Sequence, residues 1–474
     1  MNKFLFSLFL SLFSLSLFSQ QEEATAEYYA KIKSEADLAK MTFFFSQMPK
    51  GGDLHHHFGG ALYAESYLEW LTEKDYFLNT QSLKAEKTAC DDCVEISTVW
   101  EEEGLFERVL ERWSTQDYEH RFPDNLPPDQ HFFNTFYYFG NPDFRKYKEG
   151  LQNLRERAIR ENVQYIETQA LMIRVPMKFP SYDEPLWSAQ QKGDSNRVFE
   201  VLAEIEDQLK GKELDEVVKV YIERLKGYHE DLDNEEFTIR FQSYIVRFLN
   251  PTDIFTHLYA SFMVAEQSPL IVGVNIVAPE HGRVSMKDYW LHMQIFRYLS
   301  GKFPQVKKSL HAGELALGMV KPEDLTYHIH DAIFIAEADR IGHGIDIPYE
   351  KEALKTMKYM AKEGKAVEVN LTSNEFILGI SGPQHPLRLY REFGVPLVIS
   401  TDDPGVSRNS LTNEYLLLGS RYEFSYTEIK SLVYNSIRYS FLSPKDKLLN
   451  LRRLDSKFEA FEKMIAEHYL SIKD

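Results

Sequence analysis

The sequence predicts an α/β protein built as a (β/α)8 TIM barrel. Short apolar runs alternate with amphipathic helical patterns along the 474 residues. Histidines and acidic residues follow directly after several of these runs, which suits a barrel because its active site forms at the carboxyl ends of the strands. The spacing agrees: 32 residues separate His311 from His343, about one strand–helix unit, and 59 separate His343 from Asp402, about two.

The expected strands are apolar runs bounded by polar or turn residues. They are Asp53–His57, Val163–Ala170, Thr238–Val246, Leu270–Val277, Val306–His311, Arg340–His343, Ala366–Leu371 and Val395–Ser400. Amphipathic periodicity predicts helices at Met286–Leu299, Pro322–Ala338 and Glu352–Glu363. Pro322 suits a first helical turn.

Two segments exceed a minimal barrel. Residues 71–150 are too long for a simple loop and predict a lobe inserted after the first strand. Residues 412–470 predict a helical tail packed around the barrel. The lobe contains the two cysteines, Cys90 and Cys93. A local disulfide is the favoured interpretation in an exported protein. Two free thiols, or half of a zinc site that needs two further ligands, are the alternatives.

Residues 1–19 predict a signal peptide. Lys3 precedes a Leu/Phe/Ser run, Phe4–Phe18, that is short for a membrane span and is followed at once by polar residues. We therefore expect export to a periplasm or the medium without a stable membrane anchor, the alternative being an uncleaved anchor. Residues 20–474 are expected to form one barrel domain. The net charge of −18 argues against a nucleic-acid-binding surface; it does not predict the oligomeric state.

Four residues at the ends of expected strands predict a zinc site. His55 and His57 are two positions apart on one strand, so their side chains share a face. His311 closes the fifth run and Asp402 follows the eighth. Three imidazoles and one carboxylate form a ligand set that suits zinc.

Three further residues supply acid, base and substrate-binding groups. A bound divalent ion lowers the pKa of its water to about 7, and His343 is placed to orient that water, the alternatives being a fifth ligand or a buried structural histidine. Glu314 lies three residues after His311 and can deliver a proton to substrate. Asp403 is expected to contact substrate or, alternatively, to cap the turn before Pro404. Together they predict metal-assisted hydrolysis.

The motifs MPKGGDLHHHFGGAL, SLHAGE, RIGHG and STDDPG resemble those of the adenosine deaminase family over about residues 40–470. The MPKG lead-in, the export signal and the lobe are similar to its secreted branch, the adenosine deaminase-related growth factors. The resemblance implies one Zn2+ per chain on His55, His57, His311 and Asp402. It also implies that Glu314 protonates purine N1, that His343 assists the water and that Asp403 bonds N7. Adenosine or 2′-deoxyadenosine would then be converted to inosine or 2′-deoxyinosine and ammonia.

The chain departs from the family pattern near the substrate. An acidic residue that contacts the ribose 5′-hydroxyl often follows the HxH pair, whereas Phe58 and Gly59 follow it here. The glycine whose N–H binds purine N3 is matched by Ala278, which precedes Pro279. The chain also has a shorter segment before MPKG than the secreted branch, so dimerisation through that segment is not expected.

Three other functions remain open. A related deaminase could act on another aminopurine, although no Arg/Lys cluster that could cradle a phosphate lies beside the motifs. A different barrel amidohydrolase would often bridge two metals with a lysine, which the run LIVGVNIV lacks. A catalytically silent extracellular binding protein is the third alternative, and the intact ligand set with Glu314 argues against it.

Overall fold

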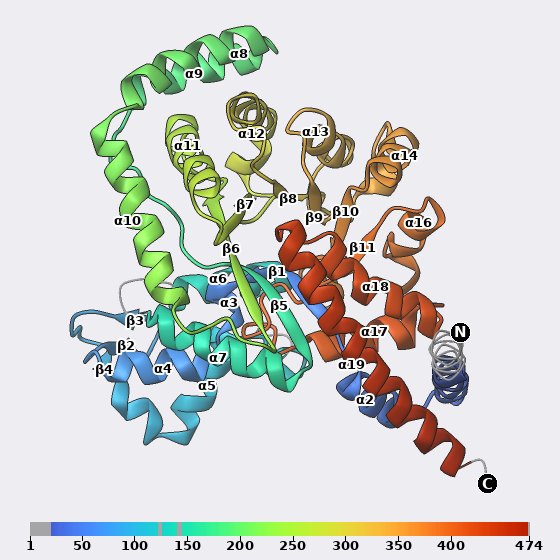
Figure 1. The fold of residues 1–474 in the computed structure, drawn as a ribbon. Coiled ribbons are helices and arrows are strands. Elements are labelled where there is room, and N and C mark those ends of the chain that lie inside the picture. Colours follow the sequence, from blue (N-terminus) through green and yellow to red (C-terminus); the bar gives the residue numbers. More distant parts are fainter. Residues whose placement is uncertain (1–19, 122–125, 140–144, 473–474) are drawn as a thin grey trace.

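The computed structural model describes residues 20–121, 126–139 and 145–472. Its centre consists of two four-stranded parallel sheets, ordered β1-β5-β6-β7 and β11-β10-β9-β8 (Figure 1). These strands are β1 (Gly51–His57), β5 (Val163–Gln169), β6 (Thr238–Val246), β7 (Ile271–Val277), β8 (Ser309–Ala312), β9 (Arg340–His343), β10 (Ala366–Val369) and β11 (Leu397–Ile399). Each of the eight predicted strands overlaps one of them.

Isolated parallel bridges join the edges of the two sheets. Val274 of β7 pairs with Lys308, just before β8, and His56 of β1 pairs with Asp402, just after β11. Every residue of β5, β8, β9, β10 and β11 is buried. Strands covered on both faces read as continuous apolar runs, which explains why the sequence reveals them. Their carboxyl ends lie on one side of the molecule.

Helices lie outside the strands in the second half of the chain (Figure 1). They are α11 (Pro251–Gln267), α12 (Arg283–Lys302), α13 (His328–Phe334), α14 (Ala353–Glu363) and α16 (Leu387–Glu392). A further helix, α15 (Leu371–Leu378), follows directly after β10. The helices predicted at Met286–Leu299 and Glu352–Glu363 are confirmed by α12 and α14. The prediction of one helix over Pro322–Ala338 is wrong: a 3-10 turn, Pro322–Leu325, precedes α13. The Glu350 carboxylate accepts from the backbone N–H groups of Ile329 and His330 and so caps a separate helix start.

The segment between β1 and β5 contains a small antiparallel sheet with helices around it. Its elements are α3 (Phe58–Ala61), α4 (Ala64–Thr72), β2 (Phe77–Asn79), β3 (Ala85–Glu86), β4 (Cys93–Glu95), α5 (Glu103–Trp113), α6 (Pro128–Tyr138) and α7 (Tyr147–Arg160). The small sheet has the order β3-β2-β4. Cys90 and Cys93 form a disulfide, as predicted.

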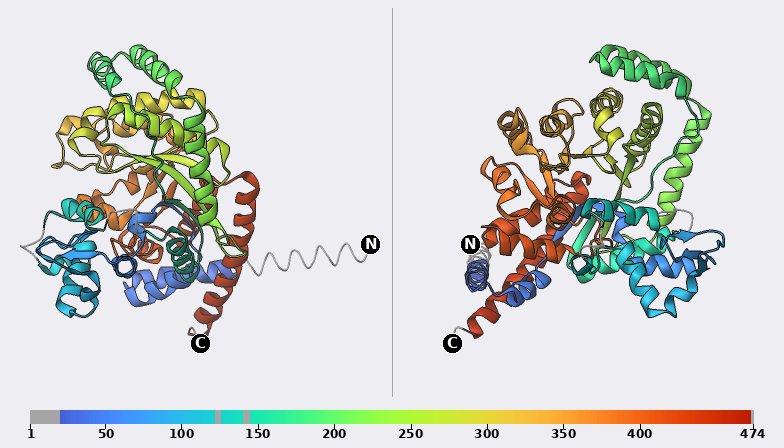
Figure 2. Two further views of the ribbon diagram at one scale, coloured as in Figure 1. Left: turned by 90° about the vertical axis from the view of Figure 1, so that its left-hand side faces the viewer. Right: turned by 180° about the vertical axis from the view of Figure 1, so that it is seen from behind.

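A second excursion, which the sequence analysis did not predict, separates β5 from β6. It comprises α8 (Asp183–Gln191), α9 (Ser195–Leu209) and α10 (Lys212–His229). Figure 2 shows α8 and α9 at the edge of the molecule, where they pack against α12.

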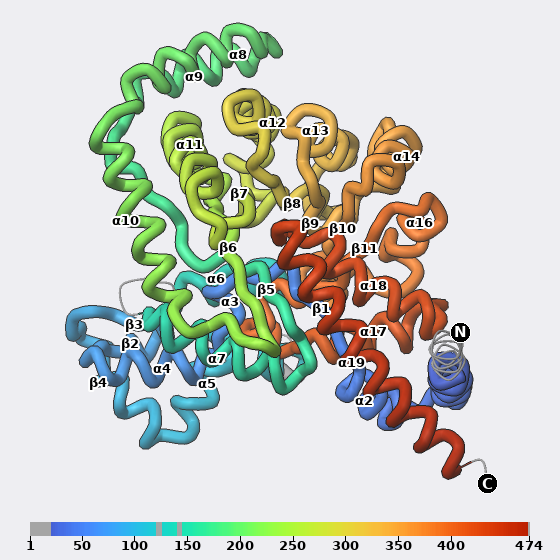
Figure 3. Tube along the Cα trace, in the orientation of Figure 1, coloured from blue at the N-terminus to red at the C-terminus, as the bar shows by residue number. Residues whose placement is uncertain are grey.

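The predicted helical tail is confirmed. It consists of α17 (Leu411–Arg421), α18 (Tyr426–Arg438) and α19 (Pro444–Ser471), and α18 packs against β1 and β11. The helical residues 20–34 and α2 (Leu38–Gln47) lie beside this tail (Figure 3), with the Phe44 ring 5.2 Å from that of Phe461. None of the helices in the described part of the chain has the length and apolarity needed to cross a membrane. The predicted signal peptide, residues 1–19, lies outside the described residues.

Candidate active site

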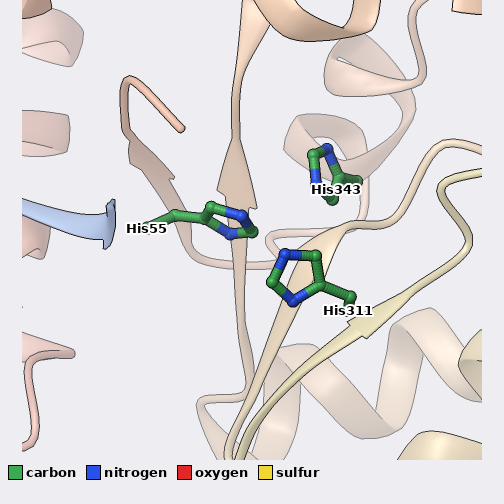
Figure 4. Close-up of side chains that lie close together, drawn as sticks. All are labelled: His55, His311 and His343. Atoms are coloured by element: carbon green, nitrogen blue, oxygen red, sulfur yellow. The ribbon is translucent and has the colours of Figure 1, made fainter. Parts of the chain in front are cut away.

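The predicted metal ligands come together at the carboxyl ends of the strands. His55 and His57 lie in β1, His311 lies in β8, and Asp402 follows β11. Figure 4 shows the rings of His55 and His311 facing one another, with His343 from the end of β9 beside them.

Four distances of similar length link the donor atoms of these residues. Nε2 of His57 is 3.4 Å from Nε2 of His55 and 3.2 Å from Nε2 of His311. Oδ1 of Asp402 is 3.2 Å from Nε2 of His57 and 3.5 Å from Nε2 of His55. A tetrahedral site with metal–ligand bonds of about 2.0–2.1 Å has ligand–ligand edges of about 3.3–3.4 Å. These four distances agree with the edges of a tetrahedral zinc site. Among the described residues, the potential ligands form overlapping groups, His55 with His57 and Asp402, and His55 with His311 and His343, whose ligand atoms lie within 4.8 Å of one another.

A buried carboxylate orients His55. Nδ1 of His55 is 2.8 Å from Oε2 of Glu368, so Nδ1 carries the proton and donates it. Glu368 also accepts from Nε of Arg340 at 2.5 Å and from the hydroxyl of Ser309 at 2.7 Å. Arg340 holds the pKa of Glu368 down to about 2 against the opposing effect of burial. Nε2 of His55 faces the other ligands. Burial alone would lower the pKa of His55, but hydrogen bonds to Asp402 and Glu368 raise it to about 10, so a bound cation would take the place of the Nε2 proton.

An asparagine orients His311 in the same way. The backbone N–H of Ile276 donates to Oδ1 of Asn275 at 2.8 Å, which identifies this oxygen as an acceptor. Nδ1 of His311 lies 3.0 Å from the same oxygen and must donate to it. Nε2 of neutral His311 therefore carries no proton, and its lone pair faces Nε2 of His57.

This set of donors fits a cation. Nε2 of His55 and Nε2 of His57 lie 3.5 and 3.2 Å from Oδ1 of Asp402, and Nε2 of His311 lies 3.2 Å from Nε2 of His57. Burial alone would raise the pKa of Asp402, but hydrogen bonds from His55 and His57 hold it well below its usual range. Asp402 also has a φ of +66°, and strained backbone of this kind is concentrated at functional sites. The residues present thus fit a divalent metal such as zinc.

Glu314 is placed as an acid above the ligands. Its backbone N–H donates to Oε2 of Glu280 at 2.8 Å, and the N–H of Gly313 donates to Oε1 of the same residue at 3.1 Å. Glu280 thus holds the turn that carries Glu314. Burial raises the pKa of the Glu314 carboxyl well above its usual range, and the negative charge of Asp402 adds to this effect. A buried carboxyl kept protonated can donate a proton to substrate.

A chain of hydrogen bonds determines the tautomer of His343. The backbone N–H of Leu387 donates to Nδ1 of His385 at 3.1 Å, so the proton of neutral His385 is on Nε2. That proton points to Oδ1 of Asn374 at 3.2 Å. Nδ2 of Asn374 then donates to Nδ1 of His343 at 3.0 Å. Burial lowers the pKa of His343 to about 3, so the ring is neutral and carries its proton on Nε2, which lies 3.7 Å from Oε1 of Glu314.

Asp403 is buried directly beside Asp402. Its Oδ1 has no hydrogen-bond partner among the described residues. Burial, reinforced by the charge of Asp402, raises the pKa of Asp403 well above its usual range. A Cβ atom at Gly60 would overlap this carboxyl group, so glycine is required there. Asp403 can therefore donate a proton to a ligand atom.

These groups face one cavity of about 480 Å³, a size typical of small-molecule sites. Phenylalanines of α6 form part of its wall, which brings the inserted lobe over the site. The lining includes His57, His311, Glu314, His343, Asp402, Asp403, Ala278, Phe132, Phe133 and Phe136. The cavity therefore combines apolar walls with converging acid, base and ligand groups.

The family model for adenosine deaminase matches residues 213–457. The chain belongs to the adenosine deaminase family. It is 32% identical over 151 residues to an adenosine deaminase of Clostridium acetobutylicum, covering 32% of this chain and 42% of that protein. It is 30% identical over 200 residues to an adenine deaminase of Rhizobium rhizogenes, covering 41% of this chain and 56% of that protein. These matches span about half the length of the curated relatives.

The fold is also similar to that of the N6-methyl-AMP deaminase of Arabidopsis thaliana. The TM-score is 0.56 at 19% identity, covering 88% of this chain and 98% of the plant protein. At that identity the likeness concerns the fold alone. In this member of the adenosine deaminase family, the substrate has to be argued from the site itself.

Ala278, the predicted substrate contact, lies in the cavity wall. Its φ is +83°, a conformation that suits glycine and strains alanine. The structure shows no hydrogen bond to the N–H of Ala278 among the described residues. That N–H is available to a ligand, as the resemblance implies.

The residues that hydrogen-bond to the candidate ligands and acids, and so hold them in place, were not predicted from the sequence. Glu368 and Asn275 orient two ligands, Glu280 holds the Glu314 turn, and Asn374 orients His343. A signal for the first two was present: each is a polar residue within an otherwise apolar buried strand, in AVEV and IVGVNIV. Such residues need a buried partner.

Proposed function

We propose that this protein is a zinc-dependent aminohydrolase that converts adenosine and 2′-deoxyadenosine to inosine and 2′-deoxyinosine, with release of ammonia. One observation carries the proposal. Four distances of 3.2–3.5 Å link donor atoms of three histidines and Asp402, beside a cavity that also contains protonatable Glu314 and Asp403. Membership of the adenosine deaminase family supports the same chemistry.

His55, His57, His311 and Asp402 would hold one zinc ion. Bound there, zinc would supply positive charge and lower the pKa of a water molecule so that it can attack at neutral pH. The strand β7 lacks a lysine that could bridge a second metal, so we propose one ion per chain.

The chain's own acids and bases would carry the proton transfers. Glu314, kept protonated by burial, donates to ring nitrogen N1 and so makes C6 electron-poor. The Nε2–H of His343 donates a hydrogen bond to the attacking oxygen and orients it toward C6. Asp403 donates to N7 and fixes the purine plane, and the N–H of Ala278 bonds N3.

We also propose that the two sheets close into a (β/α)8 barrel. The parallel bridges Val274–Lys308 and His56–Asp402 support closure on both sides. The site then lies at the carboxyl ends of the strands, where barrels of this type form their active sites. One barrel domain over residues 20–474, with the lobe inserted after β1, accommodates both excursions.

Export through a cleaved signal peptide, residues 1–19, is part of the proposal. The Cys90–Cys93 disulfide supports an oxidising compartment, and the likeness to the secreted branch agrees. The acidic net charge supports a small purine nucleoside rather than a nucleic acid as partner. Sequencing the N-terminus of the protein recovered from the medium or periplasm tests this, with Gln20 expected first. An intact Met1 would contradict it.

A substrate panel tests the proposed reaction. Zinc-loaded protein is incubated with adenosine, 2′-deoxyadenosine, adenine and adenosine 5′-monophosphate, and the loss of absorbance near the adenosine maximum is followed with ammonia release. We expect turnover of both nucleosides. Turnover of adenine alone would favour the second candidate, an adenine deaminase, which the similarity to the Rhizobium rhizogenes protein keeps open. No turnover of any of the four would contradict deamination and favour a silent binding protein.

A further inference from the structure

A half-buried arginine, Arg145, lies where the sequence predicts the sugar end of the substrate. Gly59 is the second residue after the predicted ligand His57. A Cβ atom at Gly59 would lie 3.2 Å from Nη1 and 3.4 Å from Nη2 of Arg145. The guanidinium therefore occupies the space next to the turn at which an acidic residue often contacts the ribose 5′-hydroxyl in the family. The sign of the charge at this corner is reversed.

Among the described residues, Arg145 is surrounded by phenols in this corner. Within residues 20–121, 126–139 and 145–472, no carboxylate forms an ion pair with its guanidinium, and its Nε is buried without a hydrogen-bond partner. The groups around it are phenols: Tyr67, whose ring centroid is 5.8 Å from Cζ of Arg145, with Tyr147 and Tyr244. Phenols are neutral at pH 7. The guanidinium is partly withdrawn from solvent, and a partly desolvated cation without a counter-charge is costly, so an anion would complete this corner.

Arg145 stands between two cavities. It lines the 480 Å³ cavity that contains Glu314 and Asp403, and it also lines a second cavity of about 840 Å³. The second cavity carries Arg174 and Arg224 as well as Glu213 and Glu216. A substituent that extends from the sugar past Gly59 meets Arg145 first.

We infer that Arg145 binds an anionic substituent at the sugar end of the substrate, and that the preferred substrate class is the purine nucleoside 5′-monophosphate. A phosphate matches the planar, multiply donating guanidinium and neutralises it. An uncharged nucleoside still fits the base-binding end but leaves Arg145 unpaired. The inference rests on the proposed deamination and specifies its substrate.

Kinetics of the parent and of variants test the inference. The quantity compared is the ratio of kcat/KM for adenosine 5′-monophosphate to kcat/KM for adenosine. In the parent we expect the ratio to exceed about 10. Gly59→Asp places a carboxylate against Arg145 and should lower the ratio at least tenfold. Gly59→Asn, equal in size but neutral, is the matched control and should lower it less than threefold. Both side chains can be placed, because φ of Gly59 is not positive and only the flexible end of Arg145 must shift.

Arg145→Met and a binding measurement complete the test. Calorimetry should show that inosine 5′-monophosphate binds the parent more tightly than inosine, and that Arg145→Met removes at least tenfold of this difference. The inference would be overturned by a parent kcat/KM ratio below 1 that neither Gly59→Asp nor Arg145→Met changes. Turnover of adenosine in the same assay would still leave the proposed deamination intact. Failure to deaminate either substrate would contradict the proposed function, and the calorimetric comparison would then decide the role of Arg145 alone.

Discussion

Asn374→Asp reverses the hydrogen bond that sets the tautomer of His343. The side chain keeps its shape, and His385 still finds an acceptor in it. The amide donor that lies 3.0 Å from Nδ1 of His343 is replaced by an acceptor. The imidazole then satisfies the carboxylate by carrying its proton on Nδ1, which leaves a lone pair on Nε2, facing Glu314.

The size of the effect follows from the two hydrogen bonds that are exchanged. Removing the Asn374–His343 bond withdraws about 0.5–1.5 kcal/mol from the parent tautomer, and a bond from Nδ1–H to a carboxylate adds about 1.5–3 kcal/mol to the other. The balance shifts by about 2–4.5 kcal/mol, which corresponds to roughly a 30- to 2000-fold decrease in kcat at 1.36 kcal/mol per decade. Asn370 is the control, because its Nδ2 is 3.4 Å from the same nitrogen; Asn370→Asp should lower kcat less than tenfold.

The assay combines turnover with two structural measurements. Adenosine deamination gives kcat, metal analysis should show unchanged zinc, and 15N NMR of the imidazoles should report the proton of His343 on Nε2 in the parent and on Nδ1 in Asn374→Asp. A variant with the proton moved but with kcat within threefold of the parent would refute the role given to the Nε2–H of His343.

Three further variants separate the remaining roles. Glu314→Gln should retain zinc and lower kcat about 10²- to 10⁴-fold, because the amide cannot donate a carboxylic proton; equal loss of metal and activity would make Glu314 a ligand. Asp403→Asn should retain zinc and weaken turnover of adenosine more than that of 7-deazaadenosine, which lacks N7; discrimination between the two substrates as strong as in the parent would show that Asp403 does not contact that atom. Ala278→Gly should raise the free energy of unfolding by about 1 kcal/mol in equilibrium urea denaturation. Glycine relieves the backbone strain of φ +83°, and the greater entropy of the unfolded glycine variant offsets part of this stabilisation. A lower stability would show that the alanine is unstrained.

The central strands could be predicted because their environment is simple. A parallel strand buried on both faces reads as an apolar run, and the polar residue after it marks its carboxyl end. The helix boundaries were harder to predict. Pro322–Ala338 has helical periodicity throughout, but its division depends on Glu350, a capping residue from outside the segment. The excursion α8–α10 is amphipathic in sequence, but helical periodicity alone does not show that three helices stand between two neighbouring strands.

The candidate ligands could be predicted because each closes or follows a strand, but their supporting residues could not. His385 orients Asn374, which in turn orients His343, and this series of hydrogen bonds depends on a turn at Leu387 that no local pattern reveals. Arg145 is separated from Gly59 by 86 residues of sequence, so the absence of a basic cluster beside the motifs did not predict a neutral pocket. Tertiary packing, which sequence spacing does not encode, brings the two together.

The most direct test of the account is a zinc titration of metal-free protein. Adenosine deamination should be absent without metal, rise in proportion to added zinc and reach a plateau at one ion per chain. His57→Ala, which lacks one of the four donors, should recover no activity at that stoichiometry. Full activity in the metal-free protein, or a plateau only at two ions per chain, would contradict a single zinc held by His55, His57, His311 and Asp402.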